Sequence, residues 1–229
     1  MKRSSAEEAA SAFELSRGER SLVVRFAATQ RMCSWAIVNG GFTEARDVGW
    51  IEVRGSDLKP PIDARRVLRA RLAQAGAVGA VGFLTSRDVT TFVDVTAHDC
   101  DVRSRCIATV GLGNALRAGD PPGPAGRIGT INLLCHVDVP LTDEALLEAM
   151  SIATEARTAS ILEAAVPSLR SGLPATGTGT DCIVMATPLA GRREPYAGKH
   201  TRIGHVVGAA VAQAVRRGAA EWKAERGAA

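Results

Sequence analysis

The densest group of side chains that could do chemistry occupies residues 176–181, which read Thr-Gly-Thr-Gly-Thr-Asp. A loop that cradles a phosphate follows a strand and opens a helix, whereas this loop precedes a predicted strand, so a nucleotide site is not indicated. The loop offers Thr176, Gly177, Thr178, Gly179 and Thr180 as substrate-binding residues and Asp181 as a carboxylate for proton transfer. A purely structural glycine-threonine turn is the alternative.

A second group, Tyr-Ala-Gly-Lys-His-Thr at residues 196–201, comes directly before the predicted C-terminal helix. Helical spacing puts His200 on the face of Ile203 and Val207, so we expect His200 to point inward. The same spacing puts His205 on the polar face. A helix N-terminus favours the neutral imidazole that can act as a base. A capping or core histidine is the alternative.

The long helix predicted from Thr142 adds two more candidates. Arg157 falls on the apolar stripe with Met150 and Ala153, so its guanidinium must find a partner or a substrate. Glu155 falls on the opposite, polar face, where it is either a catalytic carboxylate or a solvated acid.

Other candidates are single residues. Asn39 and Asn114 lie beside glycines at turns, where an amide either holds a substrate or stabilises the turn. Cys182 could be a nucleophile with His200 as its base, although a lone cysteine that starts an apolar strand is more often inert. The histidines and cysteines show no zinc-type spacing, so no protein-bound metal is predicted.

Short apolar runs separated by turn residues predict about seven strands. The candidate strands are residues 22–26, 34–38, 50–53, 78–84, 89–95, 106–112 and 130–137, and the apolar run 182–186 after the loop adds one more. One helix should run from a cap at Asp63 to Gly76, and the last from about Thr201 to Trp222.

These elements do not alternate regularly. We therefore expect an α+β fold in which a mixed, largely antiparallel sheet packs against a long central helix and a C-terminal helix. Residues 1–20 read as a poorly patterned N-terminal extension with a short helix.

Length and composition favour one globular domain over residues 1–229, with 46% hydrophobic and 4% aromatic residues. The net charge of +4 is scattered among acids, so no nucleic-acid partner is expected. Five unpatterned cysteines and the lack of a secretory leader favour the reducing cytoplasm. No apolar run approaches the roughly 20 residues that a membrane span needs.

Several motifs, taken in order, resemble the adenosylcobinamide amidohydrolase family. They are residues 39–41, 82–85, 111–114, 129–132, 153–156, 176–181 and 196–201. The resemblance extends from about Ser34 to Arg217, and its most specific part is the pair Thr-Gly-Thr-Gly-Thr-Asp and Gly-Lys-His-Thr. Arg157 departs from the pattern, because lysine is expected there.

The resemblance implies hydrolysis of the amide that joins aminopropanol, or its phosphate, to the corrin ring of adenosylcobinamide. The product would be adenosylcobyric acid for cobalamin salvage, without ATP and without a cofactor from the protein. The partner implied is a small corrinoid, and a homo-oligomer is compatible with the sequence. The matched motifs contain Glu155, Asp181, Lys199 and His200, which therefore become site members.

Amide hydrolysis needs an activated nucleophile, a stabilised oxyanion and a proton for the amine. In our preferred scheme Asp181 and His200 activate water. Lys199 or the amides of Gly177 and Gly179 steady the oxyanion, while Asn39 and Asn114 bind corrin amides. Alternatives use Cys182 as nucleophile, or a metal at Asp181, Glu155 and His200. A non-catalytic corrinoid binder or chaperone is the rival function, and a nucleotide-dependent ligase or kinase would need a phosphate loop.

Overall fold

The computed structural model describes residues 12–55, 57–59, 61–123 and 128–227. Its strands are β1 (Phe13–Gly18), β2 (Ser21–Ser34), β3 (Gly41–Glu52), β4 (Val81–Thr85), β5 (Val93–Asp99), β6 (Val102–Val110), β7 (Ala115–Leu116), β8 (Ile131–Val137), β9 (Gly177–Thr178) and β10 (Cys182–Pro188). The helices are α1 (Ala64–Gln74), α2 (Asp143–Glu163) and α3 (Arg202–Gly227), with a 3-10 turn at Val89–Thr91. The fold is α+β, as predicted.

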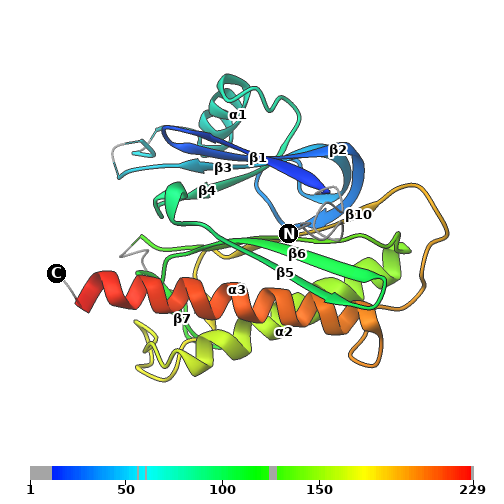
Figure 1. Ribbon diagram of the computed structural model, residues 1–229. Coiled ribbons are helices and arrows are strands. Elements are labelled where there is room, and N and C mark those ends of the chain that lie inside the picture. Colours follow the sequence, from blue (N-terminus) through cyan, green and yellow to red (C-terminus); the bar gives the residue numbers. More distant parts are fainter. Residues whose placement is uncertain (1–11, 56, 60, 124–127, 228–229) are drawn as a thin grey trace, which may run out of the picture.

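The main sheet has eight strands in the order β4-β3-β2-β10-β8-β6-β5, with β1 also paired to β2. The long strand β2 has a register irregularity between Arg25 and Gln30. Strands β1, β3 and β4 form one part of the sheet, strands β5, β6, β8 and β10 form the other, and the two parts face each other (Figure 1). An apolar core that includes Trp50, Phe83 and Leu134 fills the space between them.

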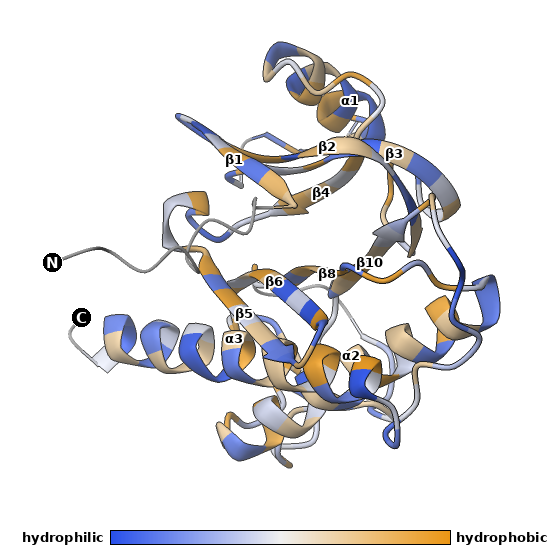
Figure 2. Cartoon of the chain, turned by 45° about the vertical axis from the view of Figure 1, so that its right-hand side comes forward, coloured by the Kyte–Doolittle hydropathy of each residue, from blue (hydrophilic) through white to orange (hydrophobic). Residues whose placement is uncertain are grey.

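Helices cover both outer faces of this folded sheet. Leu68 and Leu72 of α1 pack on β3 and β4, and a larger core joins α2 and α3 to the other part. The result is four layers, which are α1, the two parts of the sheet, and α2 with α3. Along α3 apolar residues alternate with polar ones (Figure 2). Among the described residues, no helix has the length and apolarity that a membrane crossing requires.

Local signals set the helix ends. The Thr142 hydroxyl accepts from the amide of Ala145 and caps α2, and Asp143 lies in the first turn. Asp63 caps α1 in the same way, and Gly76 just beyond it has a φ of +72°. The predicted beginnings of both helices are confirmed.

The prediction of a poorly patterned extension over residues 1–20 is wrong for the described residues from 12 onward. Residues 13–18 form β1, a hairpin partner of β2, and residues 1–11 lie outside the described residues. Phe13 is 2% exposed and packs edge-on against Phe26 with ring centroids 5.1 Å apart. This strand depends on a tertiary contact that its own weak pattern does not reveal.

The sheet is mixed: among the described strand pairs of the main sheet, five are antiparallel and two are parallel. Strands β3 and β4 are parallel, and so are β8 and β10. Parallel neighbours need a crossover, which α1 supplies for the first pair and α2 for the second.

The prediction of a strand at residues 34–38 is wrong, since β2 ends at Ser34.

A buried histidine lies in the central core. His136 is 3% exposed, its ring lies 5.1 Å from that of Phe26, and its Nε2 is 3.2 Å from Gln30 Oε1. Burial lowers the pKa of His136 from 6.5 to about 3, and the positive charges of Arg103 and Arg105 act in the same direction.

This histidine should make the fold sensitive to acid. In the unfolded chain His136 becomes protonated below about pH 6.5, whereas in the native protein it becomes protonated only near pH 3. Stability therefore falls as the pH drops through that window, by up to about 1.4 kcal/mol per pH unit from this group. His136→Gln should give a shallower slope in denaturation measured from pH 7 to pH 4. His205→Gln, at an exposed position on α3, should keep the wild-type slope, and equal slopes in all three proteins would contradict the prediction.

Candidate functional site

A cleft of about 470 Å³ opens between the two parts of the sheet. Its walls come from the connection after β2, from β4, and from the segments that lead into β8 and β10. Trp35, Ile37 and Ile128 are exposed apolar residues in these walls. Among the described residues that line the cleft, Asp181 is the only charged one.

Uncharged polar groups lie deeper in the cleft. Asn132 on β8 is 1% exposed, and its Nδ2 donates to the carbonyl oxygen of Leu84 on β4 at 2.9 Å. This bond connects the two parts of the sheet across the cleft. Thr130 is also buried, and its hydroxyl donates to the carbonyl oxygen of Thr180 at 2.7 Å.

The loop at residues 176–181 forms one rim of the cleft and lies against Asn114. Strand β9 in this loop pairs with β7, and the amide of Gly179 donates to the carbonyl oxygen of Asn114 at 3.2 Å. Thr176 accepts from the amide of Ala118 at 2.8 Å. The structure therefore brings Asn114 and the loop together. It also assigns the Gly179 amide to the fold, which removes it as an oxyanion donor.

The side chain of Asp181 is 8% exposed and is held by four donors. The amides of Thr178 and Ile131 donate to it at 3.0 and 3.2 Å, and so do the Thr178 hydroxyl and Arg157. Burial raises the pKa of Asp181, while Arg157 and the Thr178 and Ile131 donors oppose the rise. The expectation that Arg157 finds a partner is confirmed.

Glycine at position 177 lets the loop approach this ion pair closely. A Cβ atom there would collide with the Asp181 carboxylate and would lie 2.8 Å from Nη1 of Arg157. The glycine therefore lets the loop pack directly on the pair. Gly177 therefore allows close packing, and Thr178 donates hydrogen bonds to the Asp181 carboxylate.

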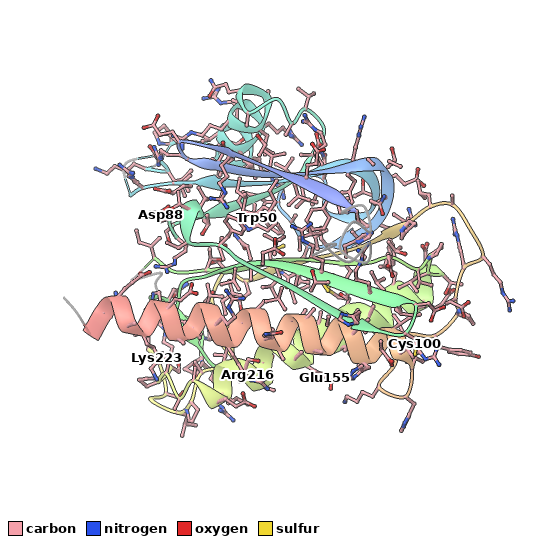
Figure 3. The ribbon with its side chains drawn as sticks, in the orientation of Figure 1. Trp50, Asp88, Cys100, Glu155, Arg216 and Lys223 are labelled. Atoms are coloured by element: carbon pink, nitrogen blue, oxygen red, sulfur yellow. The ribbon has the colours of Figure 1, made fainter. Side chains whose placement is uncertain are left out.

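The segment at residues 196–201 organises the start of α3. The amide of Ala197 donates to Glu148 of α2 at 2.7 Å, and the Thr201 hydroxyl accepts from the amide of Gly204 at 2.9 Å. Lys199 forms an ion pair with Glu155, and both side chains are more than half exposed, at 69% and 52%. These contacts place the segment on the outer, helical side of the molecule, where Figure 3 shows Glu155.

The inward orientation predicted for His200 is wrong. His200 is exposed, because α3 begins at Arg202 and the helical spacing does not extend back to residue 200. His205 is exposed, as predicted.

The predicted pairing of Asp181 with His200 also fails. The four donors to the Asp181 carboxylate come from Thr178, Ile131 and Arg157, and His200 is exposed instead of joining them. No group of three or more histidine, cysteine or carboxylate side chains in the described residues could hold a metal ion. Asp181, Glu155 and His200 are thus not assembled as a metal site.

Two further candidates have clear surroundings. Burial raises the pKa of Cys182 to about 12, so almost no thiolate exists at neutral pH, although the residue lines the cleft. Asn39 has a φ of +54° and donates to the carbonyl oxygens of Gly79 and Ala80 at 3.0 and 2.9 Å. Asn39 therefore stabilises its turn.

Sequence reasoning missed Trp35 and Asn132. The Trp35 ring N–H donates to the carbonyl oxygen of Asp181 at 2.6 Å, and the ring is 49% exposed at the cleft. For Asn132 a signal existed, because it is an amide inside the apolar strand 131–137. A polar residue on a buried strand needs partners or a ligand.

Comparisons with known proteins agree on one family. The model of the family described as adenosylcobinamide amidohydrolase matches residues 6–227. A protein of that name from Halobacterium salinarum is 33% identical over 190 residues, which are 78% of this chain and 75% of that protein. An uncharacterized protein from Methanocaldococcus jannaschii is 38% identical over 93 residues, 40% of this chain and 36% of its own length.

A crystal structure of a protein from Pyrococcus horikoshii OT3 covers 86% of this chain and 76% of its own, with a TM-score of 0.43 and 10% identity. That likeness is too distant to inform the fold or the site. The sequence matches suffice for classification, because one spans nearly the whole chain and the other exceeds 30% identity over three quarters of it: the chain belongs to the adenosylcobinamide amidohydrolase family.

Proposed function

We propose that the protein hydrolyses the amide bond joining the aminopropanol arm, or its phosphate, to the corrin ring of adenosylcobinamide. The products are adenosylcobyric acid and the free amine, and the reaction serves cobalamin salvage in the cytoplasm without ATP or a cofactor from the protein. Family membership supports hydrolysis of adenosylcobinamide in general. The structural observation that carries the proposal is the cleft, with apolar walls, a neutral polar floor and the motif loop at its rim.

The size of the cleft favours entry of the arm alone. A corrin ring with its amide side chains is much wider than a cavity of about 470 Å³, whereas a short amide-linked arm fits inside it. The ring then rests at the mouth on Trp35, Ile37 and Ile128, which are 49%, 40% and 65% exposed. Such exposed apolar groups suit contact with a large ligand.

Asp181 is the proton-transfer group in this proposal. Its carboxylate accepts a proton from water, the resulting hydroxide adds to the amide carbon, and the proton passes to the nitrogen as the C–N bond breaks. A pKa raised by burial makes the carboxylate a better base. His200 and Glu155 take no part, because both are exposed on the helical side.

A corrinoid binder without catalysis is the second candidate. The observation that favours it is the saturation of the Asp181 carboxylate by four donors, which is also what a structural anchor requires.

The first test is a direct assay. Incubation with adenosylcobinamide in the absence of nucleotide should release free aminopropanol, and added ATP should not change the rate. Asp181→Asn should lower turnover by a factor of roughly a hundred or more, while the exposed control Glu163→Gln should not. Corrinoid binding without any aminopropanol would identify a binder, and an absolute need for ATP would refute the proposed reaction.

A second test separates a base from an anchor. The charge of Arg157 lowers the pKa of Asp181, so Arg157→Met should raise that pKa further. Because the base must be ionised, the acid limb of the kcat/KM profile should move to higher pH. Arg157→Lys keeps the charge and should leave the limb near its wild-type position.

Arg216→Met is the matched control for loss of a charge, since Arg216 pairs with the exposed Glu163 on the helical side. Its acid limb should not move. A lower rate in Arg157→Met with an unshifted limb would show that Asp181 only anchors the loop.

A further inference from the structure

A buried hydroxyl beside the cleft has no hydrogen-bond partner among the described residues. It is Oγ1 of Thr109 on β6, and Thr109 is 0% exposed. Buried polar atoms are nearly always paired with protein or with ordered water, so one that the protein leaves unpaired needs an explanation. The position of Thr109 supplies one.

Thr109 lies directly opposite Asn132, which belongs to the cleft floor. Ile107 on β6 and Leu134 on β8 both face the core between the two parts of the sheet. Since side chains alternate along a strand, Thr109 and Asn132 face the same way. Opposed residues in an antiparallel pair have Cβ atoms about 5 Å apart, so the two polar groups are neighbours.

Asn132 also keeps free hydrogen-bonding capacity. Its amide has two N–H donors, and the bond to Leu84 uses one of them. Its Oδ1 lies 3.5 Å from the Thr130 hydroxyl, at the outer limit of a hydrogen bond. The single proton of that hydroxyl is already directed to Thr180 at 2.7 Å. Asn132 therefore retains a donor and an acceptor.

We infer that Asn132 and Thr109 recognise the neutral arm of the substrate and select it over its phosphate. This inference rests on the proposed function. Asn132 is complementary to the amide, because its N–H donates to the amide oxygen and its Oδ1 accepts the amide N–H. The arm carries a hydroxyl two carbons from the amide nitrogen, and Thr109 bonds that hydroxyl.

Selection against the phosphate follows from burial. Thr109 has no exposed surface, so a group that reaches it is cut off from water. A phosphate in place of the hydroxyl would bring its charge among buried polar side chains that are uncharged, namely Thr85, Thr130 and Asn132 in the cleft lining and Thr109 opposite Asn132. Burial of an unpaired charge is far more costly than burial of a hydroxyl.

Thr109→Val is the sharpest test, because it removes only the unpaired hydroxyl and keeps the shape. The variant should be at least as stable as the wild type, since it loses no hydrogen bond of the fold. Its kcat/KM for adenosylcobinamide should fall roughly threefold to tenfold, mainly through KM. Thr109→Ser should restore it.

Thr187→Val is the matched control. Thr187 is also buried on a sheet strand, but its hydroxyl donates to the carbonyl oxygen of Val139, at the end of β10 away from the cleft. This variant should lose stability and keep its kcat/KM. Wild-type kcat/KM in Thr109→Val, or an equal fall in Thr187→Val, would overturn the inference.

Two substrate comparisons complete the test. The wild type should have a kcat/KM for adenosylcobinamide at least about tenfold above that for its phosphate, and equal or reversed values would overturn the selection. Rapid-mixing binding should also show tighter binding of adenosylcobinamide than of adenosylcobyric acid, which lacks the arm. Asn132→Ala should remove that difference.

The binding measurement distinguishes a failure of this inference from a failure of the proposed function. If the protein binds neither corrinoid, the proposed function itself fails. If it hydrolyses adenosylcobinamide but binds both corrinoids equally, only the assignment of Asn132 and Thr109 fails.

Discussion

The ion pair between Arg157 and Asp181 joins three parts of the chain that are distant in sequence. Arg157 comes from α2, Asp181 ends the loop that leads into β10, and the same carboxylate accepts the amide of Ile131 at the start of β8. A buried carboxylate without these donors would be strongly destabilising. The pair therefore fixes the loop to the crossover helix. It also sets where the two parallel strands β8 and β10 begin.

The cleft depends on that arrangement. Thr130 and Asn132 flank Ile131 and line the cleft, whereas the amide of Ile131 donates to the Asp181 carboxylate. The Arg157 guanidinium reaches this carboxylate from the helical side, and the cleft floor keeps uncharged polar groups. Asp181 lies between the two, because it pairs with Arg157 and also lines the cleft.

Local chemistry in the sequence predicted much of this fold. The caps at Thr142 and Asp63 act within one turn, so their residue types suffice. Arg157 on an apolar stripe required a partner, but the identity of that partner depends on how α2 packs. His200 was misplaced because helical spacing was continued beyond the first turn of α3, where the chain is no longer helical. Long-range contacts, such as Phe13 on Phe26, leave little trace in a local pattern.

The two most specific motifs serve different needs. In residues 196–201 the small and hydroxyl residues have clear structural duties: Ala197 donates to Glu148, Gly198 lies against the same carboxylate, and Thr201 caps α3. In residues 176–181 the hydroxyl and carboxylate groups bind each other and Arg157 at the rim of the cleft. Of these two motifs, only the loop at residues 176–181 therefore contributes a group to the proposed reaction, which is Asp181. The residues that a substrate would meet, Asn132 and Thr109, are ordinary polar positions on buried strands, and what distinguishes them is their unused hydrogen-bonding capacity.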